Sequence, residues 1–372
     1  MHIRLLPQQR PVFRWALQTK LVPFALFFLV LFFSLTSNLY QNLKMKLKLS
    51  NLSRLTLAAA LVAGTTLSLA PLQSVHAAAP MVKTSAPGYF RMMLGDFEIT
   101  ALSDGTVNLP VDKLLTNTTP AKVNKALAKS FLTSPLETSV NGYLVITGSK
   151  LILIDTGAAK LFGPTLGNLA ANLKAAGYQP EQVDEIYITH LHPDHVGGLM
   201  DGDKMVFANA TVRADKHDAD FWLSQANLDK APTEAKGFFQ GAMASLNPYV
   251  KANRFSSFEG NIDLVPGIKA IATHGHTAGH SIYMVESKGQ KLAIWGDLVH
   301  VAAVQFDDPT VTIQFDTESK AAASQRKRAY AEAAKNGHLV AAAHIAFPGI
   351  GHVRASGKAY TWVPVNYTLV RP

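Results

Sequence analysis

The chain has 372 residues and no cysteine, which excludes disulfides, thiolate metal ligands and cysteine nucleophiles. Its 35 Lys and Arg exceed its 26 Asp and Glu, for a formal net charge of +9, but residues 1–77 hold eight of the cations and no acidic residue. Residues 78–372 are therefore nearly neutral, and without a basic stripe we expect no nucleic-acid partner.

The N-terminal part contains two apolar runs. The first, residues 21–33, is shorter than the roughly 18–20 residues of a membrane-spanning helix. The second has the three parts of a signal peptide: basic residues after Met45, an apolar stretch over residues 55–70, and a small-residue cleavage site ending at Ala77.

We therefore expect residues 45–77 to be a signal peptide and residues 1–44 to be an extension upstream of the true start. Cleavage near Ala77 would release an exported protein, periplasmic or secreted, with no membrane contact in its mature form. The alternative is that residues 21–33 form a short membrane anchor.

Residues 78–372 are predicted to form one domain in which strands and helices mix irregularly. Alternating or apolar runs predict strands at 97–102, 143–147, 151–155, 185–189, 205–213, 269–272, 281–286, 291–295 and 338–343. Helical spacing predicts helices at 121–131, 161–176, 218–225, 238–245 and 317–336. Asp104-Gly105 indicates a turn. Hairpins mixed with helices indicate two packed sheets flanked by helices.

The most informative segment follows the predicted strand 185–189 and reads His190-x-His192-x-Asp194-His195. In extended backbone alternate side chains share a face, so His190 and His192 can reach one ion. Pro193 then turns the chain, so that Asp194 and His195 can address a neighbouring position. Gly197-Gly198 allows close backbone approach. Four potential ligands within six residues predict a metal site.

This motif matches the signature of the metallo-β-lactamase superfamily, and further matches follow in order: residues 153–157, 275–280, 296–297 and His344. The chain resembles that superfamily, which implies an α/β fold, the αββα four-layer sandwich, with a two-metal site at the sheet edges. Longer stretches at residues 86–89, 143–145, 162–166 and 347–352 make residues 80–372 most similar to the methyl parathion hydrolases, a group of organophosphorus hydrolases.

The resemblance implies two divalent metal ions, zinc or alternatively manganese, cobalt or iron. Water held between them would give hydroxide near neutral pH, which attacks the substrate, with Asp297 and Asp194 as the catalytic carboxylates. The implied ligands are His190, His192 and His276 for one ion, Asp194, His195 and His344 for the other, and Asp297 as the bridge.

Other histidines are expected to play lesser parts. His274 and His280, which flank His276, are predicted to make hydrogen bonds around the site. His300 lines the pocket or lies on a solvated loop, two readings that the sequence favours equally. The remaining histidines of the domain, His217, His338 and His352, have no ligand-like context.

The resemblance also implies a substrate pocket built from Phe162, Trp222 and Phe238. By sequence alone these rings fit a core better, and only their positional match favours a pocket. Such a pocket suits a small neutral ester, and we expect hydrolysis of phosphotriesters. The alternative is a lactonase or esterase, for instance on acyl-homoserine lactones. A di-iron redox protein on the same scaffold is more remote. The resemblance further implies a homodimer.

Overall fold

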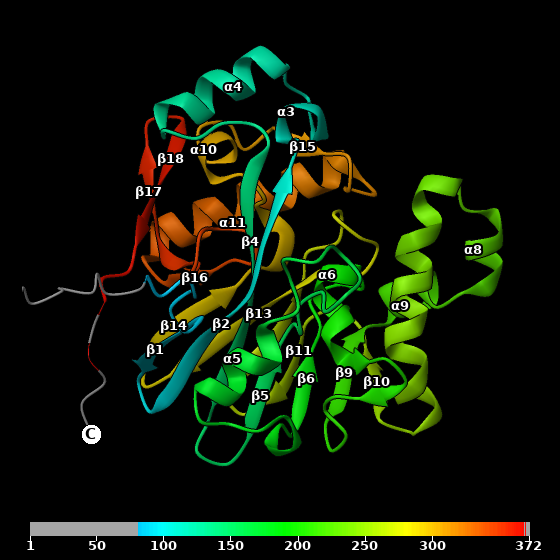
Figure 1. Ribbon diagram of the computed structural model, residues 1–372. Coiled ribbons are helices and arrows are strands. Elements are labelled where there is room, and N and C mark those ends of the chain that lie inside the picture. The colour runs from blue at the N-terminus through cyan, green and yellow to red at the C-terminus, as the bar shows by residue number, and fades with distance from the viewer. Residues whose placement is uncertain (1–80, 368, 370–372) are drawn as a thin grey trace, which may run out of the picture. The chain divides into compact units, whose positions relative to one another are not determined.

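The computed structural model describes residues 81–367 and 369 (Figure 1). By its contacts the chain divides into residues 1–82 and residues 83–372, and the elements below lie in the second unit. The predicted upstream extension and signal peptide fall outside the described residues and stay predictions. Within the described part, no helix combines the length and the apolar character that crossing a membrane requires.

Two seven-stranded sheets form the centre of the fold. The first has the order β1 (Tyr89–Leu94), β2 (Phe97–Leu109), β4 (Leu136–Ile146), β5 (Leu151–Ile154), β6 (Glu185–Tyr187), β9 (Thr211–Asp215) and β10 (Phe255–Phe258). The second has the order β11 (Ile262–Val265), β12 (Ile268–Ala272), β13 (Ser281–Ser287), β14 (Gln290–Ile294), β16 (Leu339–Ala341), β17 (Ile350–Ser356) and β18 (Ala359–Pro364).

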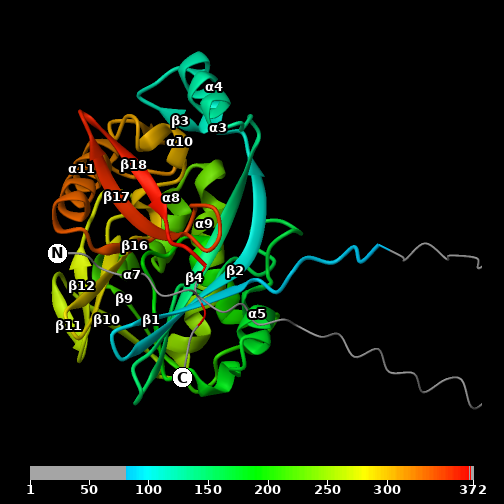
Figure 2. The same cartoon turned by 90° about the vertical axis from the view of Figure 1, so that its left-hand side faces the viewer.

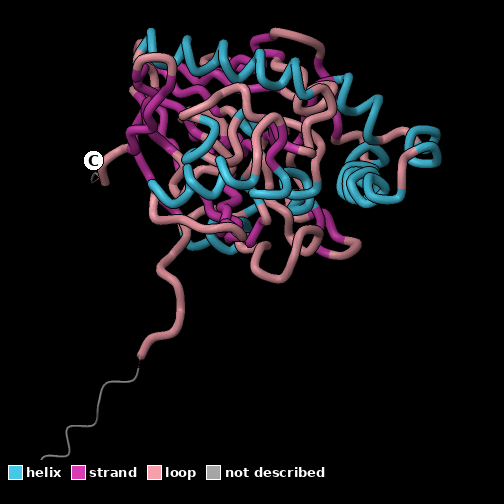
Figure 3. Tube along the Cα trace, turned by 90° about the horizontal axis from the view of Figure 1, so that it is seen from above, coloured by secondary structure: helices cyan, strands magenta, loops and turns pink. Residues whose placement is uncertain are grey.

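Helices cover the outer face of each sheet (Figure 2), and Figure 3 shows them on both sides of the strands. On the first sheet, α5 (Leu169–Ala175), α7 (Lys216–Trp222) and α9 (Thr233–Lys251) bury apolar side chains against the strands. On the second, α11 (Ser319–Asn336) does the same. Between the sheets lies a third apolar cluster, which includes Ile152 and Tyr283. The predicted αββα sandwich is confirmed.

The shorter elements lie at the ends of the sandwich. At the top of Figure 1, α3 (Val111–Leu114), α4 (Pro120–Lys129) and α10 (Ala302–Gln305) share an apolar cluster with the strand pair β3 (Leu115–Thr116) and β15 (Thr312–Ile313). The remaining elements are α6 (Pro193–Val196), α8 (Gln225–Lys230), the strand pair β7 (Met200–Asp201) and β8 (Lys204–Met205), and the 3-10 turns Pro180–Gln182, Gly197–Leu199 and Gly296–Leu298.

Several predicted elements differ from the structure in their bounds, and three of them are instructive. The helix predicted over 161–176 begins only at Leu169, because Gly163 and Gly167 have positive φ and Pro164 lies between them. The turn predicted at Asp104-Gly105 is instead a bulge within β2, which continues to Leu109. The strand predicted over 205–213 is shifted to β9, with β8 preceding it.

Candidate metal centre

The seven predicted ligands converge where several strands end. His190 and His192 follow β6, while His276, Asp297 and His344 follow β12, β14 and β16 of the second sheet. Pro193 begins α6, so the chain turns as predicted and places Asp194 and His195 on that helix. This turn packs closely: a Cβ on Gly198 would lie 1.9 Å from the backbone oxygen of Thr156. The structure thus brings all seven side chains together.

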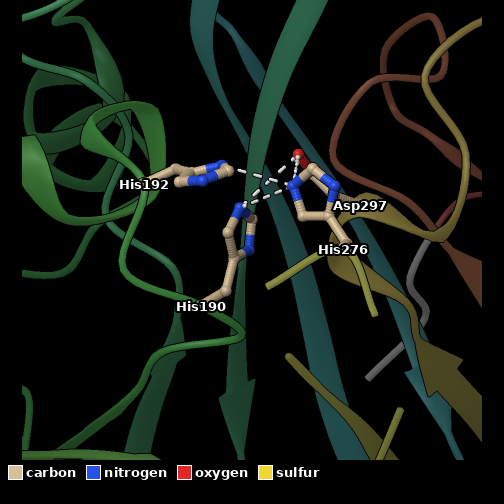
Figure 4. Close-up of side chains that lie close together, drawn as sticks. All are labelled: His190, His192, His276 and Asp297. Carbon is tan, nitrogen blue, oxygen red and sulfur yellow. Dashed lines mark hydrogen bonds and ion pairs between the residues drawn. The ribbon is translucent and has the colours of Figure 1, made fainter. Parts of the chain in front are cut away.

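The first group consists of His190, His192, His276 and Asp297, whose ligand atoms lie within 4.8 Å of one another (Figure 4). His276 Nε2 lies 3.2 Å from both His190 Nε2 and His192 Nδ1. Ligands of a tetrahedral zinc ion at ordinary Zn–N lengths are about 3.3 Å apart. The spacing of these nitrogens therefore fits one shared divalent ion.

The second group consists of Asp194, His195 and His344. Asp297 joins it to the first group, because its carboxylate lies close to histidines of both groups, and His344 Nε2 is near both of its oxygens. Oδ1 lies 3.1 Å from Nε2 of both His195 and His344. Oδ2 lies 3.2 Å from His276 Nε2 and 3.6 Å from His190 Nε2. This position fits the bridging role that the resemblance implies, which stays a prediction.

Hydrogen bonds orient four of the imidazoles by their Nδ1 atoms. His195 donates to Asp155, His276 to Asp316, and His344 to the backbone oxygen of Ser139, at 2.8, 2.8 and 2.9 Å. His190 Nδ1 lies 3.1 Å from Thr189 Oγ1, whose own hydroxyl donates to Asp155. These bonds occupy Nδ1 and leave each Nε2 facing the centre, which is the usual support of metal-binding histidines.

The electrostatics of the centre also suit cations. Burial lowers the pKa of His190 and His192 well below its usual value, so both are neutral and able to bind a metal. Two buried atoms of the centre, His195 Nε2 and Asp297 Oδ1, lie 3.1 Å apart but have no hydrogen-bond partner among the described residues. Buried polar atoms are rarely left unsatisfied. The residues therefore fit two divalent ions.

A narrow cavity of about 20 Å³, room for about one water molecule, adjoins the centre. Phe162 and Phe238 line it as predicted, together with Phe315, which sequence reasoning missed. Trp222 does not line it: this side chain is buried in the core of the first sheet, with its ring 5.2 Å from that of His192. Its predicted role in the substrate pocket stays a prediction, and its ring packs on that of Phe239 in α9.

The neighbouring histidines divide into three cases. His280 confirms its predicted role, since Nε2 accepts from the backbone N–H of Asp297. His300 is buried and lines the cavity, with Nε2 3.0 Å from Asp297 Oδ2, so it is not a solvated loop residue. His274 lies apart from the centre, in a group with Asp215 and His217. The prediction that His217 has no ligand-like context is therefore wrong.

Sequence reasoning missed several supporting carboxylates. Asp218 accepts from the backbone N–H of Leu191 and the hydroxyl of Thr277, which ties the loops of His192 and His276 together. Burial raises the pKa of Asp218 to about 6. Asp155 lay within a matched stretch, but Asp218 and Asp316 had no local signal because their partners are distant along the chain.

Comparison with known proteins identifies the family. Residues 136–344, more than half of the chain, match the profile of the metallo-beta-lactamase superfamily. The chain belongs to this superfamily. A solved superfamily member, the hydrolase AbOPH in beta lactamase superfamily, is 40% identical with a TM-score of 0.73, and the match covers 77% of this chain and 100% of that one.

Other relatives include lactonases. AidC, a dizinc quorum-quenching lactonase solved with N-hexnoyl-L-homoserine, is 25% identical with a TM-score of 0.71, over 76% of this chain and 99% of that one. The N-acyl homoserine lactonase of Bacillus cereus is 25% identical over 47% of this chain and 70% of its own length. The family match, the dizinc relative and the His/Asp cluster support a metal-dependent hydrolase; the narrower resemblance to methyl parathion hydrolases stays a prediction.

Proposed function

We propose that this protein hydrolyses small neutral esters, with N-acyl homoserine lactones as the first substrate class. The position of Asp297 carries the proposal, because its carboxylate contacts histidines of both ligand groups and lines the cavity. The lactonase relatives favour lactones over the other esters that such a centre accepts.

The chain's own residues would perform three tasks. The seven ligands hold two divalent ions, zinc in the first instance, which supply Lewis acidity and an activated water when bound. Asp155 and Asp316 keep the ligand imidazoles in position. The rings of Phe162, Phe238 and Phe315 exclude bulk water and contact the apolar part of the ester. Because the cavity is small, these rings must move when an ester enters.

Neutral phosphotriesters are the second candidate substrates. The observation that favours them is the aromatic lining of the cavity, since flat rings contact an aromatic leaving group well. Phosphotriesters and lactones need the same ligand set, so the metal centre does not discriminate between them. The residues that line the cavity therefore determine which of the two substrates is preferred, and the rates of hydrolysis of both must be compared directly.

The proposal is tested by kcat/KM of the purified, zinc-loaded protein on an N-acyl homoserine lactone, on methyl parathion and on a nitrophenyl ester. We expect the lactone to give the highest value, by about tenfold or more, a difference of about 1.4 kcal/mol in transition-state binding. Dominance of methyl parathion would establish the second candidate instead. No turnover of any of the three by fully loaded protein would refute the proposed hydrolase.

We expect His300 to support turnover but not to be required for binding of the two ions. Its Nε2 donates to Asp297, and its buried Nδ1 has no hydrogen-bond partner in the described structure. We expect His300→Ala to lower kcat about 10- to 100-fold with about two ions retained, the usual cost of losing such a partner. Partial recovery in His300→Gln, with kinetics and metal content measured together, would separate hydrogen bonding from packing.

A further inference from the structure

A second cluster of potential ligands lies outside the centre described above. Asp215 ends β9, His217 lies in α7, and His274 follows β12. His217 Nδ1 lies 2.9 Å from Asp215 Oδ1, and His274 Nε2 lies 3.4 Å from Asp215 Oδ2. The two imidazole rings are 4.9 Å apart, and one ligand atom from each of the three residues lies within 4.8 Å of the others.

The buried negative charge of Asp215 favours a cation beside it. Its side chain is fully buried, and its ion pairs in the described part of the chain are with these two histidines. Asp218, buried nearby, adds a second carboxylate whose charge interacts with that of Asp215. A buried carboxylate without Lys or Arg is costly unless a cation neutralises it. Its Oδ1 accepts one backbone N–H at the start of α7, and a bound metal ion would supply the positive charge that this contact does not.

The exposure of the cluster allows an ion to enter. The side chains of His217 and His274 are 48% and 35% exposed, whereas Asp215 forms a buried floor beneath them. Two imidazoles, one carboxylate and a water from solvent make a four-coordinate set. This set suits zinc and related transition-metal ions and provides too few oxygens for calcium or magnesium.

We propose that Asp215, His217 and His274 form a third, auxiliary site for a divalent transition-metal ion of the zinc class. The ion would link α7 to the loop that carries His276, two residues beyond His274. The separations of 2.9 and 3.4 Å involve different oxygens of Asp215, so small side-chain movements would bring both imidazoles and the carboxylate to one ion. This site is independent of the proposed hydrolysis, because it shares no ligand with the centre.

The test is the zinc content of the protein after equilibrium dialysis against excess free zinc. We expect about three ions per chain in the unchanged protein and about two in His217→Gln and His274→Gln. His352→Gln, a control at an exposed histidine, should retain about three. His217→Gln is expected to fold, because Asp215 Oδ1 still accepts the backbone N–H of residue 217. As a second measurement, zinc should raise the unfolding temperature by an amount that shrinks in His217→Gln.

Two results would overturn the third site. One is saturation of the unchanged protein at two ions per chain. The other is retention of the third ion in both His217→Gln and His274→Gln. Failure of the central site is distinguishable, because it lowers the zinc content of the unchanged protein and of His352→Gln below two.

Discussion

Replacing Asp297 by Asn is expected to lower kcat on the order of 10²–10³-fold, the range found when one preorganised electrostatic group of an active site is lost. The carboxylate contacts both ligand groups, with Oδ1 toward His195 and His344 and Oδ2 toward His276. An amide of the same size removes the shared negative charge and directs an NH₂ group at imidazole nitrogens. Both changes weaken the attraction for two cations at once.

The measurement combines kcat, metal content and circular dichroism. The spectrum should be unchanged, because Asn occupies the same volume, while the metal content falls below two ions per chain. Asp307→Asn is the matched control, since Asp307 is exposed and pairs only with Lys129 among the described residues. Near-normal turnover of Asp297→Asn would contradict the bridging role.

Removing the ions with a chelator is expected to abolish turnover and to make the centre take up protons. In the metal-free protein, burial opposes the charged form of His276, but Asp297 and Asp316 raise its pKa to about 9. Burial also opposes the charged form of His195, but the carboxylates of Asp297 and Asp194 outweigh it and raise the pKa of His195 well above its usual value. These imidazoles bind protons when the ions leave and must release them when the ions return.

The apparent metal affinity should therefore rise with pH up to about 9, by about tenfold per pH unit for each proton displaced. Competition with a chromophoric chelator at pH 6, 7 and 8 measures this slope. Asp316→Asn should flatten it, because the pKa of His276 is then raised less. An affinity independent of pH would contradict the protonated state of these histidines, and activity that survives complete chelation would refute the role of metal ions.

The ligand set could be predicted because its signal is local. His190, His192, Asp194 and His195 lie within six residues, and the other matches follow the family order. Both features can be recognised without any distance from the folded protein. Strand-like and helix-like periodicity likewise predicted most elements of the two sheets. The helix predicted over 161–176 failed because glycines with positive φ interrupt an otherwise helical pattern.

The sequence by itself determined the family, the fold class and the chemistry of the ligands, since residue type and short spacing carry that information. Only the tertiary structure decided which chain-distant residues meet. It brought Asp316 to His276, 40 residues away, placed Trp222 in the core of the first sheet beside His192, and joined His217 to His274 through Asp215. Such contacts depend on how two sheets and their helices pack, and packing brings together side chains whose separation along the chain leaves no periodic or local pattern.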